Sequence, residues 1–293
     1  MTPVASRVAA LLGHAVAFEH PVGGGSICDA WQVGLGDGRA VFAKTLRDAP
    51  PDFFATEAAG LARLRATGAV AVPAVLVDAT GLLVLEWVDG APADARQAER
   101  LGRDLAALHE TRADSWGTPG RPCYLGPLPL PSPATGRGAA EDWPAFHAEY
   151  RLGPLLRRAV DEGGIAPADA RAVEELCVRL PEVAGPPQAP AVIHGDLWSG
   201  NVHWAADGRA RLIDPAAQGG HPETDLALLE LFGCPRLPRV LAAYAEARPL
   251  PGRAERVPLH QLQHLLAHAA LFGGGYGAQC GSAARAALRA GGG

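Results

Sequence analysis

The segment HGDLWSGN, residues 194–201, restricts what this chain can become more than any other stretch. A second aspartate, Asp214, follows 13 residues after the end of that segment and closes the hydrophobic run RLID. Asn201, the last residue of the segment, is the only asparagine among 293 residues. Two aspartates and one asparagine at this spacing predict a site that uses both charged and neutral oxygen atoms.

The composition makes the rare residues informative. Lysine and arginine together number 26, and Lys44 is the only lysine. Such a bias is typical of GC-rich coding, under which arginine serves wherever a solvated positive charge is enough. Lysine is a compact charge on a flexible stem, whereas arginine is a planar fork, and an asparagine amide offers a neutral oxygen that aspartate lacks. The alternative is that both rare residues drifted to arbitrary positions, but their surroundings favour a chemical role.

The spacing of this motif is that of phosphoryl transfer. Protein kinases combine a catalytic loop HRDLxxxxN with a metal-binding Asp further along the chain. By this pattern Asp196 orients the attacking hydroxyl and accepts its proton, while Asn201 and Asp214 are ligands for Mg²⁺ on the phosphates of ATP. The alternative is two β-turns in which aspartate side chains cap the backbone. Both motifs together, with the single asparagine between them, favour the catalytic interpretation.

The N-terminal part of the chain carries a second group of candidate residues for ATP. Lys44 ends a hairpin that follows a glycine cluster, and it is expected to reach the phosphates. Glu57, early in a predicted helix over 52–68, can pair with this lysine. The glycine cluster lacks the last glycine of GxGxxG, so it is weaker evidence, and a ligand-free glycine turn is its alternative. Its backbone N–H groups are expected to cover the phosphates, and its residues are Gly23, Gly24, Gly25 and Ser26.

The order of the predicted elements favours an α+β, bilobal, protein-kinase-like fold. Residues 1–88 are expected to form a small antiparallel sheet with one key helix, and 89–293 a mainly helical lobe. The backbone of Glu86 and Val88 is expected to hold adenine, because these residues end the last small-lobe strand. Further helices are predicted over 4–18, 93–112, 141–161 and 167–180, with an irregular loop over 113–140, a strand and a hairpin around the motif, and helices to the end.

Composition and charge exclude several classes of function. With 48% hydrophobic residues, 19% charged residues and a net charge of −5, the chain is an ordinary globular protein without a nucleic-acid footprint. No apolar run approaches the roughly 20 residues that cross a membrane. Five scattered cysteines argue against a disulfide framework or a zinc knuckle, and they favour the reducing cytoplasm.

With these residues in place, the sequence closely resembles the fructosamine kinase (ketosamine-3-kinase) family, relatives of the aminoglycoside phosphotransferases. The resemblance runs over nearly the full length, and HGDLWSGN is its most specific element. The other matching stretches are GGGSICDAW, VFAKT, FxxEAxGL, LVLEWV, IDPAAQGGHPETDLALLELFG and ALFGGGY.

The resemblance implies ATP-dependent phosphorylation of the sugar 3-hydroxyl of a ketosamine, a small or protein-bound glycation product. The unstable 3-phosphate then breaks down and frees the amine. By the same resemblance Asp196 is the catalytic base, Asn201 and Asp214 are magnesium ligands, and Lys44 and Glu57 are the phosphate-binding pair. On the substrate side it places Trp198, as a platform for the sugar, together with His221, Phe272 and Tyr276.

Several alternatives stay open. The chain could phosphorylate another small hydroxyl compound such as an aminoglycoside, for which an acidic pocket would be expected, or it could be an ATP-binding pseudokinase. His260, His264 and His268 share one helix face, and a packed face is favoured over a metal site. Relatives can carry a redox-sensitive cysteine directly after the glycines, whereas here that place is Ser26 and Cys28 lies two residues on. A monomer or a weak homodimer is expected.

Overall fold

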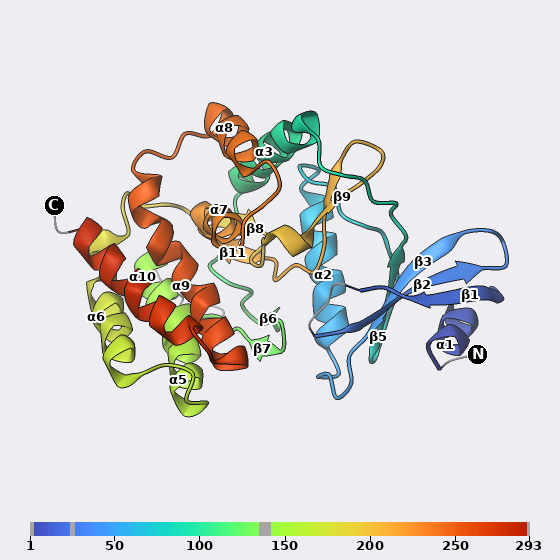
Figure 1. Cartoon of the computed structure of the whole chain (residues 1–293), viewed down its shortest axis with the longest axis horizontal. Coiled ribbons are helices and arrows are strands. Elements are labelled where there is room, and N and C mark those ends of the chain that lie inside the picture. Colours follow the sequence, from blue (N-terminus) through green and yellow to red (C-terminus); the bar gives the residue numbers. More distant parts are fainter. Residues whose placement is uncertain (1–2, 24–26, 135–141, 292–293) are drawn as a thin grey trace.

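The computed structural model describes residues 3–23, 27–134 and 142–291. It has two parts, an antiparallel sheet near the N-terminus and a mainly helical part that follows it (Figure 1). The five-stranded sheet has the order β1-β2-β3-β5-β4, and its strands are β1 (Val16–Pro21), β2 (Asp29–Leu35), β3 (Ala40–Thr45), β4 (Val75–Ala79) and β5 (Leu82–Glu86).

The β2–β3 hairpin places Lys44 as the sequence predicted. The two strands pair in register across the Gly and Asp turn, and Ala30 lies opposite Lys44. The face of β3 that carries Val41 and Ala43 packs on α1 (Pro3–Leu12) through a small apolar core. The alternate face of β3, which carries Phe42 and Lys44, is directed at the cavity described below.

One prediction for this part was wrong. The helix expected over 4–18 ends at Leu12, and β1 begins four residues later, at Val16. Gly13 has φ of 71°, a left-handed conformation that ends helices readily. Beyond it, the apolar residues of β1 continue the hydrophobic pattern, and they add an edge strand to the sheet instead of extending the helix.

The helix α2 (Phe53–Ala66) lies between the sheet and the helical part (Figure 1). Gly60 brings it close to the second part, because a Cβ at this position would be 3.2 Å from the Pro215 side chain. The hydrophobic core around α2 contains residues from both sides of residue 88, among them Leu61, Leu85 and Leu105. This shared core fixes α2 against both walls of the site.

The helical part begins with α3 (Ala95–Glu110), which starts at a capping box formed by Asp94 and Gln97. The helices expected over 141–161 and 167–180 are present, the first as two α-helical segments joined by a π-helical one. The remaining helices are α4 (Trp143–His147), the π-helical segment η1 (Ala148–Leu152), α5 (Gly153–Asp161), α6 (Pro167–Val183), α7 (Pro222–Leu231), α8 (Leu237–Ala247), α9 (Arg253–Phe272) and α10 (Tyr276–Ala290).

Short strands flank the segment HGDLWSGN, residues 194–201, which is called the catalytic segment below. The strand that precedes the HGD sequence, β8 (Ala191–Ile193), pairs with β11 (Gln218–Gly220), which the sequence did not indicate. The expected hairpin after the motif is β9 (Val202–Trp204) and β10 (Ala210–Leu212), with the 3₁₀ turn η2 (Ser199–Asn201) before it. Within residues 113–134, the part of the expected loop that the structure describes, the strands are β6 (Tyr124–Leu125) and β7 (Leu128–Pro129). Among the described residues, no helix is long and apolar enough to cross a membrane.

Gly102 tests how tightly α3 and α8 pack. A Cβ at this helical position would be 2.2 Å from the Val240 carbonyl oxygen. Helix propensity alone favours alanine over glycine by about 1 kcal/mol, yet we expect Gly102→Ala to lower the melting temperature because the backbone of α8 obstructs the added methyl group.

The matched control is Ala107→Gly on the exposed face of the same helix. This change should lower stability only by the propensity difference of about 1 kcal/mol. Thermal unfolding of both variants measures the two effects. A melting temperature for Gly102→Ala at or above that of the wild type would contradict the close packing.

Candidate active site

A cavity of about 770 Å³ lies between the sheet and the helical part. Its walls come from β2, β3, the end of β5, the start of α2, the catalytic segment, and the C-terminal end of α9. Most of the predicted site residues line it, and they are Gly23, Lys44, Glu57, Glu86, Val88, Asp196, Trp198, Asn201, Asp214, Phe272 and Tyr276. Gly24, Gly25 and Ser26 lie outside the described residues.

Lys44 connects three elements at the centre of the cavity. Its Nζ lies 2.6 Å from Glu57 Oε2 on α2 and 2.9 Å from Asp214 Oδ1 after β10. Lys44 and Glu57 are only 3% and 8% exposed. Burial alone would lower the pKa of Lys44, but the carboxylates of Asp214 and Glu57 outweigh it and hold the pKa above its ordinary value. The lysine is therefore a fixed cation at the place where phosphates are expected.

Asp196 and Asn201 form the second half of the centre. The Asn201 amide donates to the backbone oxygen of Asp196 (2.8 Å) and to its carboxylate Oδ2 (3.2 Å). With its N–H groups used in this way, the amide oxygen of Asn201 remains as an acceptor. Burial, with the nearby Asp214 carboxylate second, raises the pKa of Asp196 to about 7. A carboxylate of this basicity is suited to accepting a proton from a hydroxyl group near neutral pH.

Asp214 has an unusual backbone conformation, with φ of 53°. The residue before it is held by His194, whose Nε2–H donates to the Ile213 carbonyl oxygen at 2.9 Å. The other ring nitrogen of His194 accepts from the Asp196 backbone N–H at 3.2 Å. One neutral imidazole therefore connects the segment that carries Asp196 to the segment that carries Asp214.

A buried carboxylate, Asp225 on α7, holds the catalytic segment through backbone hydrogen bonds. It accepts hydrogen bonds from the backbone N–H groups of His194 (2.7 Å) and Gly195 (2.9 Å). His109 Nε2 lies 3.2 Å from the same carboxylate. Burial would raise the pKa of Asp225, but the hydrogen bonds from His109 and Gly195 hold it below its ordinary value. Asp225 therefore ties down the HGD segment besides supplying a charge near the start of α7.

The segment after β5 lines one end of the cavity with Glu86, Trp87 and Val88. His203 on β9 donates from Nε2 to the Val88 carbonyl oxygen at 3.0 Å, and it lines the same end. His203 was not predicted from the sequence, although its position two residues after Asn201 was a usable signal. Its hydrogen bond fixes residues 86–88 against the hairpin formed by β9 and β10.

The other end of the cavity is aromatic. Trp198 lies edge-on to Phe232, with ring centroids 6.2 Å apart. His268 lies 4.9 Å from Phe232, 5.5 Å from Phe272 and 5.0 Å from Tyr276, again between ring centroids. Phe232 and His268 were not predicted to line the site. Phe232 stood near the end of a stretch that was matched only as a whole, His268 was assigned to a packed helix face, and only the fold brings both beside Trp198.

Cys28 lines the cavity beyond the glycine cluster and is a free thiol. Burial raises its pKa to about 11, with the lysine charge acting in the opposite direction. At neutral pH the group is therefore a thiol and a poor nucleophile.

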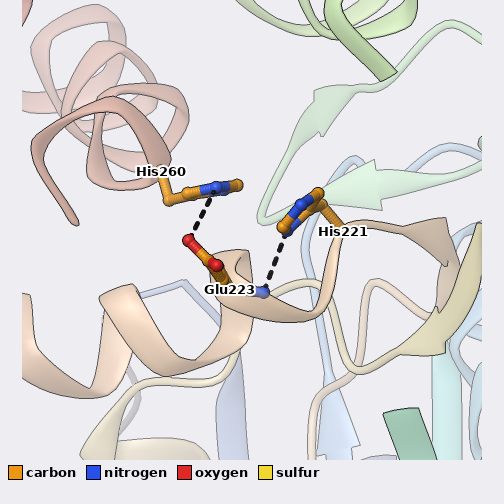
Figure 2. A group of neighbouring side chains, drawn as sticks. All are labelled: His221, Glu223 and His260. Carbon is orange, nitrogen blue, oxygen red and sulfur yellow. Dashed lines mark hydrogen bonds and ion pairs between the residues drawn. The ribbon is translucent and has the colours of Figure 1, made fainter. Parts of the chain in front are cut away.

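His221 is the predicted substrate residue that the structure places elsewhere. It caps the start of α7, where its Nδ1 accepts from the Glu223 backbone N–H at 3.2 Å, and it is 3% exposed (Figure 2). It packs against Trp143 and His260 and does not line the cavity. Its position after the GG of β11 directs the ring into the core, so its placement does not support a substrate role.

The cluster around His221 has the residue types of a metal centre. Ligand atoms of His221, Glu223 and His260 lie within 4.8 Å of one another (Figure 2). However, Arg256 donates to both carboxylate oxygens of Glu223, at 3.0 and 2.5 Å. A divalent cation would have to share that one carboxylate with a guanidinium inside the core. The arrangement is that of a buried ion pair with neutral histidines packed on it.

The comparisons with known proteins place this site in a family. The sequence profile described as fructosamine kinase matches residues 2–290. The chain belongs to the fructosamine kinase family. It is 40% identical over 259 residues to a protein of Thermus thermophilus named "Probable ketoamine kinase", covering 87% of this chain and 88% of that one. A crystal structure assigned as a fructosamine-3-kinase from Thermobifida fusca superposes with a TM-score of 0.89 at 45% identity, covering 98% and 99% of the two chains.

More distant structures confirm the fold class. The macrolide 2′-phosphotransferase of Brachybacterium faecium has a TM-score of 0.61 at 21% identity, and the match covers 96% of each chain. At this identity the likeness concerns the fold alone. The predicted α+β, protein-kinase-like architecture of a fructosamine kinase is therefore confirmed.

The buried histidines predict how stability depends on pH. Burial lowers the pKa of His147 and His221 from 6.5 to about 3. Because the unfolded chain takes up protons below pH 6.5 and these folded histidines do not, stability falls as pH is lowered from 6.5 toward 3. Each histidine should cost about 2 kcal/mol of unfolding free energy between pH 7 and pH 5.

The measurement is chemical denaturation at pH 7 and pH 5, with His147→Phe as the comparison variant. Phenylalanine can keep the stacking on Trp143, whose ring centroid is 4.6 Å from that of His147, but it takes up no proton. The variant should lose about 2 kcal/mol less than the wild type between the two pH values. An equal loss in both proteins would mean that His147 does not contribute to the pH dependence.

Proposed function

We propose that this fructosamine kinase family member uses ATP and Mg²⁺ to phosphorylate the 3-hydroxyl of the sugar in ketosamines, small or protein-bound. The observation that carries the proposal is the meeting, in one cavity, of Lys44 with its two carboxylate partners, the Asp196–Asn201 pair and an aromatic end. A cytoplasmic location is part of the proposal, since all five cysteines are free thiols and disulfides are rare in that compartment.

The residues present fit a bound Mg²⁺. Magnesium prefers oxygen ligands, and the Asn201 amide oxygen and the half-exposed Asp214 carboxylate supply one neutral and one charged oxygen. When bound, the ion would neutralise phosphate charge. Lys44 is expected to contact the same phosphates, and the backbone of Glu86 and Val88 to hold the adenine ring.

The chemical step assigned to the protein is a proton transfer. Asp196 orients the acceptor hydroxyl and takes its proton as the hydroxyl oxygen forms a bond to the γ-phosphorus. The bond between that phosphorus and the oxygen bridging to the β-phosphate breaks, and ADP leaves. The raised pKa of Asp196 favours the proton transfer, and the hydrogen bonds from Asn201 hold the carboxylate in place.

The aromatic end favours a sugar with a single amine over a polycationic drug. Aromatic side chains pack well against the apolar face of a sugar ring, and we assign this role to Trp198, with Phe272 and Tyr276 nearby. Among the described lining residues, the carboxylates are Glu57, Glu86, Asp196 and Asp214, and none belongs to the aromatic wall. An aminoglycoside would call for acidic groups at that wall. The complete catalytic set also argues against a pseudokinase.

The product of this reaction would be a ketosamine 3-phosphate. By the family resemblance, this compound is unstable and releases the amine, so the proposed biological role is deglycation.

The proposal is tested by ADP release with Mg-ATP and fructoselysine, ribuloselysine, an aminoglycoside or no acceptor. We expect turnover on the ketosamines, with the ratio of the two naming the preferred sugar. Asp196→Asn should lower kcat by about 10²- to 10⁴-fold because it removes the proton acceptor. A 3-deoxy ketosamine should not be phosphorylated, and phosphorus NMR of the product should show the 3-phosphate. Turnover on the aminoglycoside alone would refute the proposal.

Lys44→Arg tests whether the lone lysine can be replaced. Its ammonium is enclosed by two carboxylates at 2.6 and 2.9 Å, and a planar guanidinium does not fit the same space. We expect kcat/KM for ATP to fall by about 100-fold or more. The control is Arg39→Lys, an exposed cation on the loop of the same hairpin, which should leave the kinetics unchanged. Full activity in Lys44→Arg would contradict the assigned role.

A further inference from the structure

His264 on α9 is buried directly beneath the catalytic segment. Its side chain is 1% exposed, its Nε2 lies 3.0 Å from the Gly195 carbonyl oxygen, and the same atom is 3.8 Å from Asp196 Oδ1. From the sequence, His264 was predicted only as one of three histidines on a packed helix face, and it is not among the predicted catalytic residues.

The hydrogen bond fixes the protonation of the ring. A carbonyl oxygen only accepts, so Nε2 carries the proton and Nδ1 is bare. Nδ1 has no hydrogen-bond partner among the described residues. Burial lowers the pKa of His264 to about 4, so the imidazole is neutral near pH 7. It therefore acts as a hydrogen-bond donor of fixed direction.

Gly195 is held from both sides through its backbone. Its N–H donates to Asp225 on α7 at 2.9 Å, and its carbonyl oxygen accepts from His264 on α9. Its φ is 82°, and a Cβ would lie 2.3 Å from the Ala216 carbonyl oxygen, so the position requires glycine. A flexible residue directly before Asp196 is thus oriented by two helices.

The helix α9 also contributes to the aromatic end of the cavity. One turn beyond His264, His268 donates from Nδ1 to the His264 carbonyl oxygen at 2.8 Å. Ala267, His268, Leu271 and Phe272 of the same helix line the cavity. The helix that contributes to the aromatic end therefore also holds the peptide that carries the catalytic carboxylate.

We propose that His264 is a positioning residue. It sets the position of the Asp196 carboxylate relative to the aromatic end of the cavity on α9, where the acceptor sugar is expected to bind. This inference rests on the proposed function, because the distance between Asp196 and the aromatic end matters only if Asp196 takes a proton from an acceptor bound there. Loss of the hydrogen bond lets the Gly195 peptide rotate, and a displacement of about 1 Å at the reacting group is enough to lower the rate about 100-fold.

The test compares His264→Gln with His264→Asn. The glutamine amide nitrogen can take the place of Nε2 and still donate to Gly195, whereas the asparagine amide is one methylene shorter and does not reach. We expect kcat on a ketosamine within about threefold of the wild type for glutamine and about 10- to 100-fold lower for asparagine. KM for ATP should be unchanged in both, and the asparagine variant should release more ADP per phosphorylated product.

Gln261→Leu on the same helix is the matched control. Gln261 donates to the Ala227 carbonyl oxygen on α7 at 3.1 Å, the same kind of bond between a side chain and the backbone, but away from the catalytic segment. It should lower the melting temperature without changing kcat.

The outcomes separate the two proposals. A wild type that is silent on all ketosamines refutes the proposed function. An active wild type, with both His264 variants folded and equal in kcat, refutes the positioning role. A loss of kcat in Gln261→Leu that matches the loss in His264→Asn refutes it as well, because the effect would then be general loosening of α9.

Discussion

The contact of Lys44 with Glu57 and Asp214 is the interaction on which the rest of the site depends. It joins β3, α2 and the segment after β10 through one buried ammonium group. Without it, the Glu57 carboxylate would be buried without its partner, a change that typically costs about 3–5 kcal/mol. Because Lys44 lies on the sheet and Asp214 follows the catalytic hairpin β9–β10, this contact also sets the spacing between the sheet and the catalytic segment. The only lysine in the chain stands where the fold needs a compact cation.

The catalytic segment, residues 194–201, is oriented by hydrogen bonds from two neutral imidazoles and to one buried carboxylate. His194 connects it to Ile213, and Asp225 and His264 hold the two sides of the Gly195 peptide. Burial keeps the imidazoles of His194 and His264 neutral because it lowers their pKa values. These two neutral donors fix the backbone without adding positive charge to it, whereas Asp225 is a buried carboxylate that accepts from the same segment.

The sequence revealed those parts of the site that are contiguous in the chain. Lys44, Glu57 and the 194–201 motif were predicted because each has a local pattern, and the hairpin, α2 and α3 followed from periodicity and capping. The positions of His203, Phe232 and His268 in the site were not predicted. They arise because β9, α9 and the end of α7 pack beside segments that are distant in the sequence. The boundary between α1 and β1 was missed because the apolar pattern continues across Gly13. His221 was assigned to the substrate side by resemblance alone, whereas the fold directs its ring into the core at the start of α7.

The helices behind the cavity explain why a motif alone does not make this site. α7 supplies Asp225 to the Gly195 N–H, α9 supplies His264 to its carbonyl oxygen, and the ion pair of Glu223 with Arg256 fastens the two helices together. The same α9 carries His268 and Phe272 to the aromatic end. A change in the packing of these helices would therefore move the aromatic end and the catalytic carboxylate together. In the proposed reaction, acceptor preference and catalytic rate would be coupled through this pair of helices, whereas nucleotide binding would depend on the sheet and on residues 86–88.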